Sequence, residues 1–159
     1  PDEVGVLYSI DPTETLRCTR AAVRRAEEAA DHQVSFSRTG TMPSVVPTRP
    51  RLSIASQPVV FGRSMRLLTH ERHYLRGRRL YLVRAAELSM DPPHAARVSG
   101  VRLFHSARSL LGTRIKHNVN LWSCTYASGL DFDGEVATIA YGINDTDFSI
   151  ASLEWSRLW

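Results

Sequence analysis

The stretch EVATIAYGINDTDFSIASLEW, residues 135–155, contains two strand-like runs separated by a polar turn. An apolar run ends at Tyr141 and Gly142, a polar turn follows, and the second run, 147–155, alternates apolar and polar residues. Alternation with a period of two on either side of a turn is typical of paired strands. We therefore predict a β-hairpin whose first strand lies inside a sheet and whose second strand is outer and half-exposed.

Two earlier parts of the chain show the same arrangement of a mainly apolar run, a turn and an alternating run. The first pair covers residues 4–10 and 15–20, and the second covers 63–71 and 79–88. Gly5, Gly62 and Gly134 precede the first runs, and Tyr8, His70 and Tyr141 lie near their ends. A repeated unit of short strands is typical of a β-propeller, with a sandwich or an irregular meander as alternatives. We predict an all-β fold, a partial propeller with one inserted short helix.

The segment 19–51 interrupts the repeats. Its first part, 19–33, is rich in Ala, Arg and Glu and pairs Arg24 with Glu28 four residues on, which predicts a short exposed helix. Three prolines in residues 39–51 then indicate a loop. We predict one domain over 1–159 with 19–51 inserted between repeats; a domain boundary there is the alternative. Residues 101–111 fit either a strand and loop or a short helix.

Composition restricts the class of protein. The chain has 159 residues, 43% hydrophobic, and a net charge of +4 in which Lys116 is the only lysine. Such a length supports one domain with a core, and a charge this small does not predict a nucleic-acid partner. Cys18 and Cys124 are too few for a disulfide framework or a zinc knuckle, so we expect free thiols. No run of about 18 apolar residues exists. We expect no membrane span and a soluble protein, with the cytoplasm as the favoured compartment.

Three groups of residues could carry chemistry. His70 and Glu71 are adjacent on a predicted strand and should face opposite ways, and Tyr74 stands where a zinc-binding HExxH motif needs histidine. We therefore predict no metal and no cofactor. His70 is either a satisfied core residue or faces a central pocket from the end of an inner strand.

The second group lies in GTRIKHNVN, residues 112–120, where Lys116, His117 and Asn118 follow Arg114. Such donors can hold an anionic oxygen or sugar hydroxyls, or they can form an exposed basic loop. The third group is Tyr141 and Asp145, at a turn. An aspartate at a pocket rim can accept hydrogen bonds from two neighbouring sugar hydroxyls, although Asn144 and Asp145 are also ordinary turn residues.

The order of these motifs resembles a known family. His70 ends a strand, Asn118-Val119 leads to Gly129-Leu130, and a later strand ends in Tyr141-Gly-x-x-Asp145. Residues 52–159 thereby resemble the last blades of five-bladed propeller enzymes that act on glycosides, in particular the β-mannoside phosphorylases and related mannosyltransferases. Residues 4–18 would be an earlier blade. The chain has about half the length that five blades of ordinary strands need.

The resemblance implies that Asp145 binds sugar hydroxyls and that His70, with basic residues nearby, lines a sugar or phosphate subsite. The partners would be a glycan or sugar-phosphate substrate and another chain or segment that completes the propeller. Glu71 stands where the family has glycine, and the family's proton-donating aspartate has no counterpart here, so no catalytic residue is assigned. The alternatives are a non-catalytic structural or interaction subunit and, less favoured, an RNA-binding subunit. The predicted substrate-binding residues are His70, Lys116, His117, Asn118, Tyr141 and Asp145.

Overall fold

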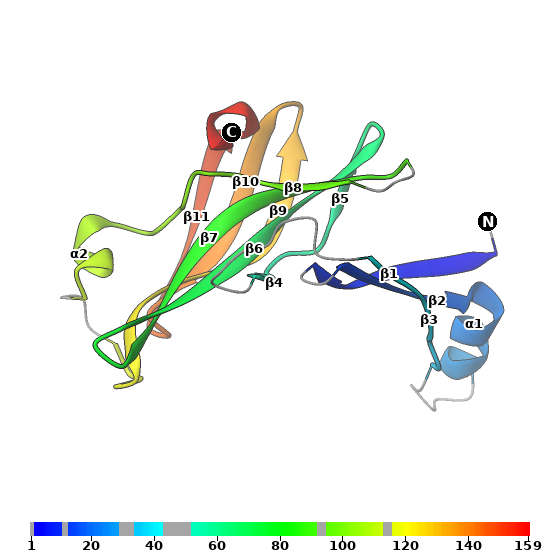
Figure 1. The fold of residues 1–159 in the computed structure, drawn as a ribbon, viewed down its shortest axis with the longest axis horizontal. Coiled ribbons are helices and arrows are strands. Elements are labelled where there is room, and N and C mark those ends of the chain that lie inside the picture. The colour runs from blue at the N-terminus through cyan, green and yellow to red at the C-terminus, as the bar shows by residue number, and fades with distance from the viewer. Residues whose placement is uncertain (1, 11–12, 29–33, 43–51, 92–94, 113–115) are drawn as a thin grey trace. The chain divides into compact units, whose positions relative to one another are not determined.

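The computed structural model describes residues 2–10, 13–28, 34–42, 52–91, 95–112 and 116–159. These residues are mostly in β-strands, which confirms the predicted all-β class (Figure 1). The chain divides into two compact units, Pro1–Pro47 and Thr48–Trp159, called the N-terminal and C-terminal units below. The prediction of a single domain with an insertion at 19–51 stays a prediction, and the units are described one at a time.

The N-terminal unit is a three-stranded antiparallel sheet with one helix. Strand β2 (Thr13–Thr19) lies between β1 (Glu3–Ile10) and β3 (Ser37–Met42). Helix α1 (Arg20–Glu28) follows β2 directly, and Thr19 Oγ1 caps it by accepting a hydrogen bond of 3.1 Å from the Ala22 amide. The predicted helix is therefore confirmed over residues 20–28, while its remainder, 29–33, lies outside the described residues.

Two details of this unit differ from prediction. The first run, β1, lies at the edge instead of inside, because β3 pairs with the other side of β2. Gly5 accordingly lies within β1 instead of before it. The strand β3 forms in a segment where a helix and a loop were expected, since its partner is set by the sheet and not by local sequence. The proline-rich residues 43–51 lie outside the described residues.

The C-terminal unit is built on five long strands. Their order in the sheet is β11-β10-β9-β7-β6, with short strands at the margins. Their bounds are β6 (Ser64–Leu75), β7 (Arg78–Ser89), β9 (Leu121–Asp133), β10 (Val136–Ile143) and β11 (Asp147–Glu154). The short elements are β4 (Leu52–Ile54), β5 (Val59–Phe61), β8 (Ala96–Val98), α2 (Ala107–Leu110) and the 3-10 helix η1 (Trp155–Leu158).

The predicted hairpins at 63–88 and 135–155 are confirmed as β6–β7 and β10–β11. β10 lies between β9 and β11, and β11 lies at the edge, as predicted. The same expectation is wrong for β7, which lies between β6 and β9 and also pairs with β8. β9, the longest strand, was not among the predicted pairs.

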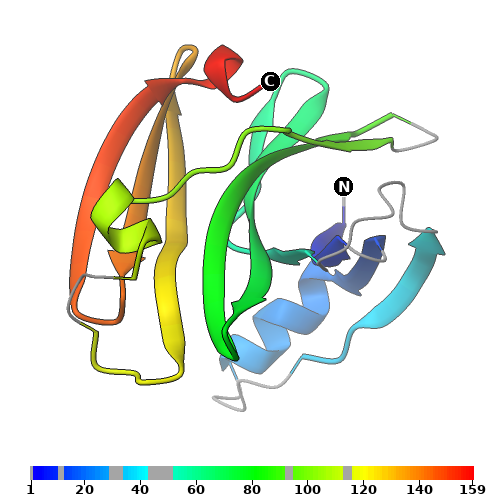
Figure 2. The ribbon, with the colours of Figure 1, turned by 60° about the vertical axis from the view of Figure 1, so that its left-hand side comes forward.

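The sheet of the C-terminal unit splits along β7. β9 runs parallel to β7 only beside Arg79–Tyr81. Further along β7, the segment 96–103 takes over this edge: β8 pairs with residues 86–88, and Val83 and Leu103 exchange backbone hydrogen bonds of 3.0 and 2.8 Å. β9 therefore diverges toward β10, and Figure 2 shows the β6–β7 and β9–β11 ribbons spreading apart. Residues 101–111 contain both this bridge and the short helix α2.

The core of the unit fills the space between the two diverging parts. Side chains from β6, β7, β9 and β10 meet there, closed at one end by η1. Removing such apolar surface from water stabilises the fold by about 1.5–3 kcal/mol for each large side chain. The buried members are Leu68, Val83, Ala85, Ala127, Leu130, Ala137, Ile139, Trp155 and Leu158.

Candidate functional site

His70 lies at the inner side of this split and is only 2% exposed. Its register partner on β7 is Val83, so it shares a face of the hairpin with core residues. The ring packs against Tyr126 in a tilted arrangement, with 4.0 Å between centroids and 38° between planes, and meets Tyr81 edge-on at 6.3 Å. Burial lowers the pKa of His70 to about 4, although a hydrogen bond to the backbone of Ala127 acts in the opposite direction. His70 is therefore neutral at ordinary pH.

One nitrogen of this neutral ring is unsatisfied. Nε2 is buried and has no hydrogen-bond partner. When the other nitrogen carries the proton, Nε2 is an acceptor that can take an O–H or N–H group. Tyr126, which contacts the ring, is 49% exposed. The unpartnered nitrogen thus belongs to a ring that packs against a half-exposed tyrosine, and a buried polar atom of this kind requires an explanation.

Glu71 points to the other side of β6, as predicted, and is also buried. Arg102 clamps it with two bonds, Nε to Oε2 at 2.6 Å and Nη2 to Oε1 at 3.1 Å. Arg84 Nη1 and His73 Nε2 lie 3.7 and 3.5 Å from Oε1. Burial alone would raise the pKa of Glu71, but Arg102, Arg84 and His73 together lower it. The side chain is therefore an ionised carboxylate and a poor proton donor.

Sequence reasoning missed the roles of Arg84 and Arg102. Arg84 also donates from Nε and Nη2 to the Ser99 carbonyl, so the cluster ties β6 and β7 to the segment that covers the split. A carboxylate inside a predicted strand is a signal for a buried cationic partner, because an unpaired buried charge is costly. That signal does not identify which arginine is the partner.

Tyr141 and His70 share one neighbour, Ala127. Tyr141 stands opposite Ala127 in the β9–β10 register, and the Ala127 backbone is the group to which His70 is hydrogen-bonded. The Tyr141 hydroxyl lies 3.4 Å from His105 Nδ1, and the His105 amide donates to Thr125 Oγ1 at 2.9 Å. Of the predicted site residues, His70 and Tyr141 are therefore the two that lie beside Ala127 of β9.

The predicted hydrogen-bond donors in the loop before β9 differ in their contacts and in their exposure. Lys116 Nζ donates to the Gly112 carbonyl at 3.0 Å and the Trp122 carbonyl at 2.9 Å, which fastens the loop to β9. Partial burial and the nearby Arg78 lower the pKa of Lys116. Asn118 Oδ1 accepts from the Asn120 amide at 3.0 Å, and His117 is exposed. Arg114 lies outside the described residues.

Asp145 is held by a buried neighbour. Asn144 is fully buried, its Oδ1 accepts from the Cys124 amide at 2.8 Å, and its own amide donates to the Cys124 carbonyl at 3.0 Å. Asn144 and Asp145 both have positive φ, 53° and 57°, as a type I′ turn requires. Asp145 is consequently exposed at a defined place beside the start of β9. Sequence reasoning named Asn144 only as a turn residue and missed this anchoring.

The six predicted residues therefore form two groups instead of one pocket. His70 and Tyr141 meet at Ala127, whereas Lys116, His117, Asn118 and Asp145 belong to the loop and turn at the end of the sheet where β9 begins. In Figure 1 the β6–β7 turn, the segment leading into β9 and the β10–β11 turn lie at the same end of the C-terminal unit. Within the described part of the chain, none of the six is hydrogen-bonded to another.

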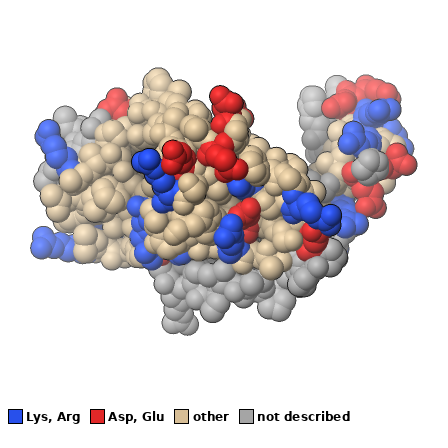
Figure 3. All heavy atoms as spheres, turned by 90° about the horizontal axis from the view of Figure 1, so that it is seen from above, with Lys and Arg blue, Asp and Glu red and all other residues tan. Residues whose placement is uncertain are grey.

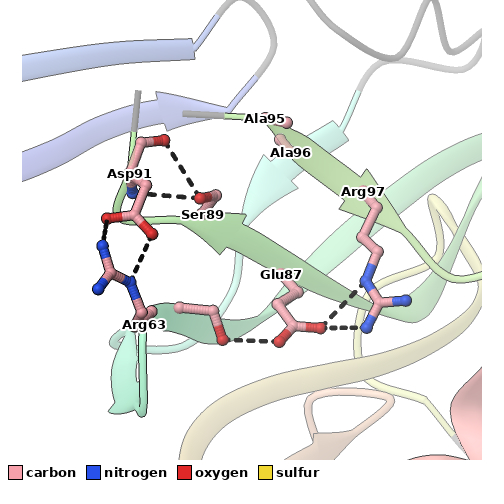
Figure 4. A pocket seen from close by; sticks show the side chains of 8 residues that line it. Arg63, Glu87, Ser89, Asp91, Ala95, Ala96 and Arg97 are labelled. Atoms are coloured by element: carbon pink, nitrogen blue, oxygen red, sulfur yellow. Dashed lines mark hydrogen bonds and ion pairs between the residues drawn. The ribbon is translucent and has the colours of Figure 1, made fainter. Parts of the chain in front are cut away.

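A separate hollow of about 430 Å³ lies beside β6, β7 and β8 and contains none of the predicted residues. Its charged side chains face one another in pairs (Figure 4). Arg63 Nε bonds Asp91 Oδ2 at 2.7 Å, and Arg97 Nε bonds Glu87 Oε2 at 3.0 Å. Each charged side chain that lines the hollow therefore has an oppositely charged partner, and the charges of each pair offset one another.

Charges on the face seen in Figure 3 are interspersed, with basic and acidic side chains next to one another. The two cysteines are free thiols, as predicted, and both are buried. No helix among the described residues is long and apolar enough to cross a membrane. Over the same ranges, no group of three or more potential metal ligands is gathered. The predictions about glycan and nucleic-acid partners stay predictions.

Comparisons with protein-family models, with curated proteins and with solved structures found no match to this chain.

Proposed function

We propose that the chain is a glycan-binding unit of a carbohydrate-active protein of the propeller type. In this proposal β4–β8 and β9–β11 correspond to two neighbouring blades, packed across the core described above. The proposal is supported by the order of the motifs, from His70 through Gly129-Leu130 to Tyr141-Gly-x-x-Asp145. It is also supported by antiparallel strands that pack in two layers with a histidine between them.

The observation that carries the proposal is the buried, unpartnered Nε2 of His70, in a ring that packs against the half-exposed Tyr126. A sugar presents hydroxyl donors together with an apolar face of C–H groups. A neutral imidazole nitrogen can accept one hydroxyl, and a tyrosine ring can pack against the apolar face while its own hydroxyl stays wet. In this proposal, the Tyr126 side chain moves to admit the sugar to Nε2.

The remaining residues would bind the outer part of the ligand. Asp145, fixed by Asn144, could accept hydrogen bonds from two neighbouring sugar hydroxyls, and His117 and Asn118 could contact a sugar or phosphate oxygen. If the unit acts in catalysis, the reaction is glycosyl transfer to phosphate, water or another sugar through an oxocarbenium-like transition state. The proton would come from outside this chain, because the family's proton-donating aspartate has no counterpart here. Glu71, which Arg102 holds ionised, would not replace it.

A second candidate is a non-catalytic structural or interaction subunit. It is favoured by the partners that several predicted site residues already have inside the chain. The Lys116 amine is bonded to two carbonyls, and the Tyr141 hydroxyl lies beside His105. Groups used in this way hold the fold together, and a fold alone does not define an activity.

A glycan array tests the proposal. The parent chain is expected to bind β-mannoside glycans, and Asp145→Ala is expected to weaken that binding. Asp133→Ala is the matched control, because it removes an exposed carboxylate from the end of β9, beside the β9–β10 turn. Equal loss in both variants would point to a general charge effect and not to a site. No glycan binding by the folded parent would leave the structural candidate standing.

A further inference from the structure

Strand β11 is an open edge of the C-terminal unit. In the part of the chain that the structure describes, β10 is the only strand that pairs with it, and its eight pairs run without a bulge. The strand, DFSIASLE, contains no lysine and no proline. Natural sheets usually protect an edge with a charge, a proline, a bulge or a covering segment. β11 has none of these in its central residues.

The outward backbone groups of β11 can be assigned. The Trp155 amide donates to the Glu135 carbonyl at 2.9 Å, so this pair is a hydrogen-bonded one. In an antiparallel ladder such pairs alternate, so residues 147, 149, 151 and 153 bond to β10. Residues 148, 150, 152 and 154 therefore direct their N–H and C=O groups away from β10. These groups are available to a further strand.

Large apolar side chains lie beside this edge. Phe148 is 86% exposed and Ile150 is 64% exposed. In the register of the sheet, Phe148 stands beside Gly142 and then Tyr126, and Ile150 stands beside Ala140. The small residues of β10 leave Phe148 and Ile150 standing above the sheet. We call Phe148, Ile150 and Tyr126 the β11 patch.

We propose that β11 pairs antiparallel with β11 of a second copy of this chain, with Ile150 opposite Ile150. The assignment of outward groups allows only pairings of even-numbered with even-numbered residues. Among them, this register uses residues 147–153 of both copies and places Phe148 opposite Ser152. It also sets Asp147 opposite Leu153, so no acidic residue opposes another. The neighbouring register with Phe148 opposite Ile150 gives a shorter ladder. The neighbouring register with Ile150 opposite Ser152 places Phe148 opposite Glu154.

A second copy fits this edge because the edge is complementary to itself. Pairing forms about six backbone hydrogen bonds and continues the β9–β11 sheet through a twofold axis. Two phenylalanine and two isoleucine side chains supply about 600 Å² of apolar surface. Stable specific interfaces bury about 1,200 Å² or more in total, so this edge-to-edge contact falls in the weak, transient class. The expected complex is a dimer that dissociates on dilution. This inference does not depend on the proposed function.

Sedimentation over a range of concentrations tests the proposal. The parent mass is expected to rise from 17.8 kDa toward twice that value. Ser152→Pro removes one outward N–H without removing a bond to β10, and it is expected to stay monomeric. Ser152→Ala is the matched control, because both variants lose the hydroxyl that lies 3.2 Å from Thr138 Oγ1. A parent that is monomeric at every concentration overturns the proposal, as does a folded Ser152→Pro variant that dimerises like the parent.

Oxidative cross-linking tests the register. Residues facing each other in a hydrogen-bonded pair have Cα atoms about 5.5 Å apart, which suits a disulfide. Ile150→Cys is expected to give a covalent dimer under mild oxidation. Val60→Cys is the matched control, since Val60 is 61% exposed on β5. The native cysteines are both buried and should react little. Equal cross-linking of the two variants overturns the assigned pairing.

Discussion

Acidification from pH 7 to pH 5 should destabilise the protein through His70. Its pKa is about 4 in the folded chain and close to 6.5 when unfolded. The unfolded chain therefore binds a proton more readily, so the stability contributed by His70 is complete above pH 6.5 and is lost as the pH falls toward 4. One pKa unit corresponds to about 1.4 kcal/mol, which sets a limit of about 3 kcal/mol for the full effect. At pH 5 the expected loss is about 2 kcal/mol.

The assay is urea unfolding at a series of pH values between 7 and 5, with the parent compared with His70→Gln. Glu71 remains ionised over this range in the folded chain, because its pKa is lowered from an already acidic value. The variant loses the packing against Tyr126 and is expected to be less stable at pH 7. Its stability should then fall less steeply with acid than that of the parent. Parallel pH profiles for the two proteins would refute the burial of a neutral His70.

Three further outcomes are expected. Glu71→Gln should lower the free energy of unfolding by about 3 kcal/mol, since it leaves Arg84 and Arg102 without their counter-charge; urea unfolding that matches the parent would contradict this. Asn144→Ala should cost about 2 kcal/mol by removing the acceptor of the Cys124 amide, and an unchanged thermal midpoint would argue against that bond. Cys124 should react slowly with a thiol reagent at pH 8, because burial, helped by the charge of Asp145, raises its pKa to about 12; rapid labelling of the folded chain would disagree.

The local hairpins could be predicted from sequence because their signals are local. Residues 135–155 contain two strand patterns and a turn whose Asn and Asp tolerate positive φ, so the hairpin β10–β11 follows directly. β9 was harder to predict, since its pattern is interrupted near Gly129, where the register with β10 shifts. The place of β7 in the sheet depends on residues 96–103 and on β9, which no pattern within β7 indicates.

The candidate site was predictable to a smaller extent. His70 was named because the sequence pattern predicted that a strand ends there; this is wrong, since β6 continues to Leu75, and the contact of His70 with Tyr126 depends on where β9 diverges from β7. The partner of Glu71, Arg102, is distant in sequence. It reaches Glu71 only because the segment 96–103 lies along β7. Lys116 has the chemistry of a ligand-binding donor, and the structure instead directs its amine to backbone carbonyls of its own loop and of β9. Residue types indicate what a group can bind, whereas the fold decides what it does bind.

The most direct test of the proposed function is nuclear magnetic resonance of the His70 ring in the parent chain with isotope-labelled histidine. A β-linked mannobiose is added, alone and with inorganic phosphate. The Nε2 resonance of His70 is expected to move in a saturable way, as a sugar hydroxyl donates to it, and the Asp145→Ala variant should require more sugar for the same change. A His70 resonance that stays unchanged at high sugar concentration, in a folded chain, would contradict a glycan site at this histidine.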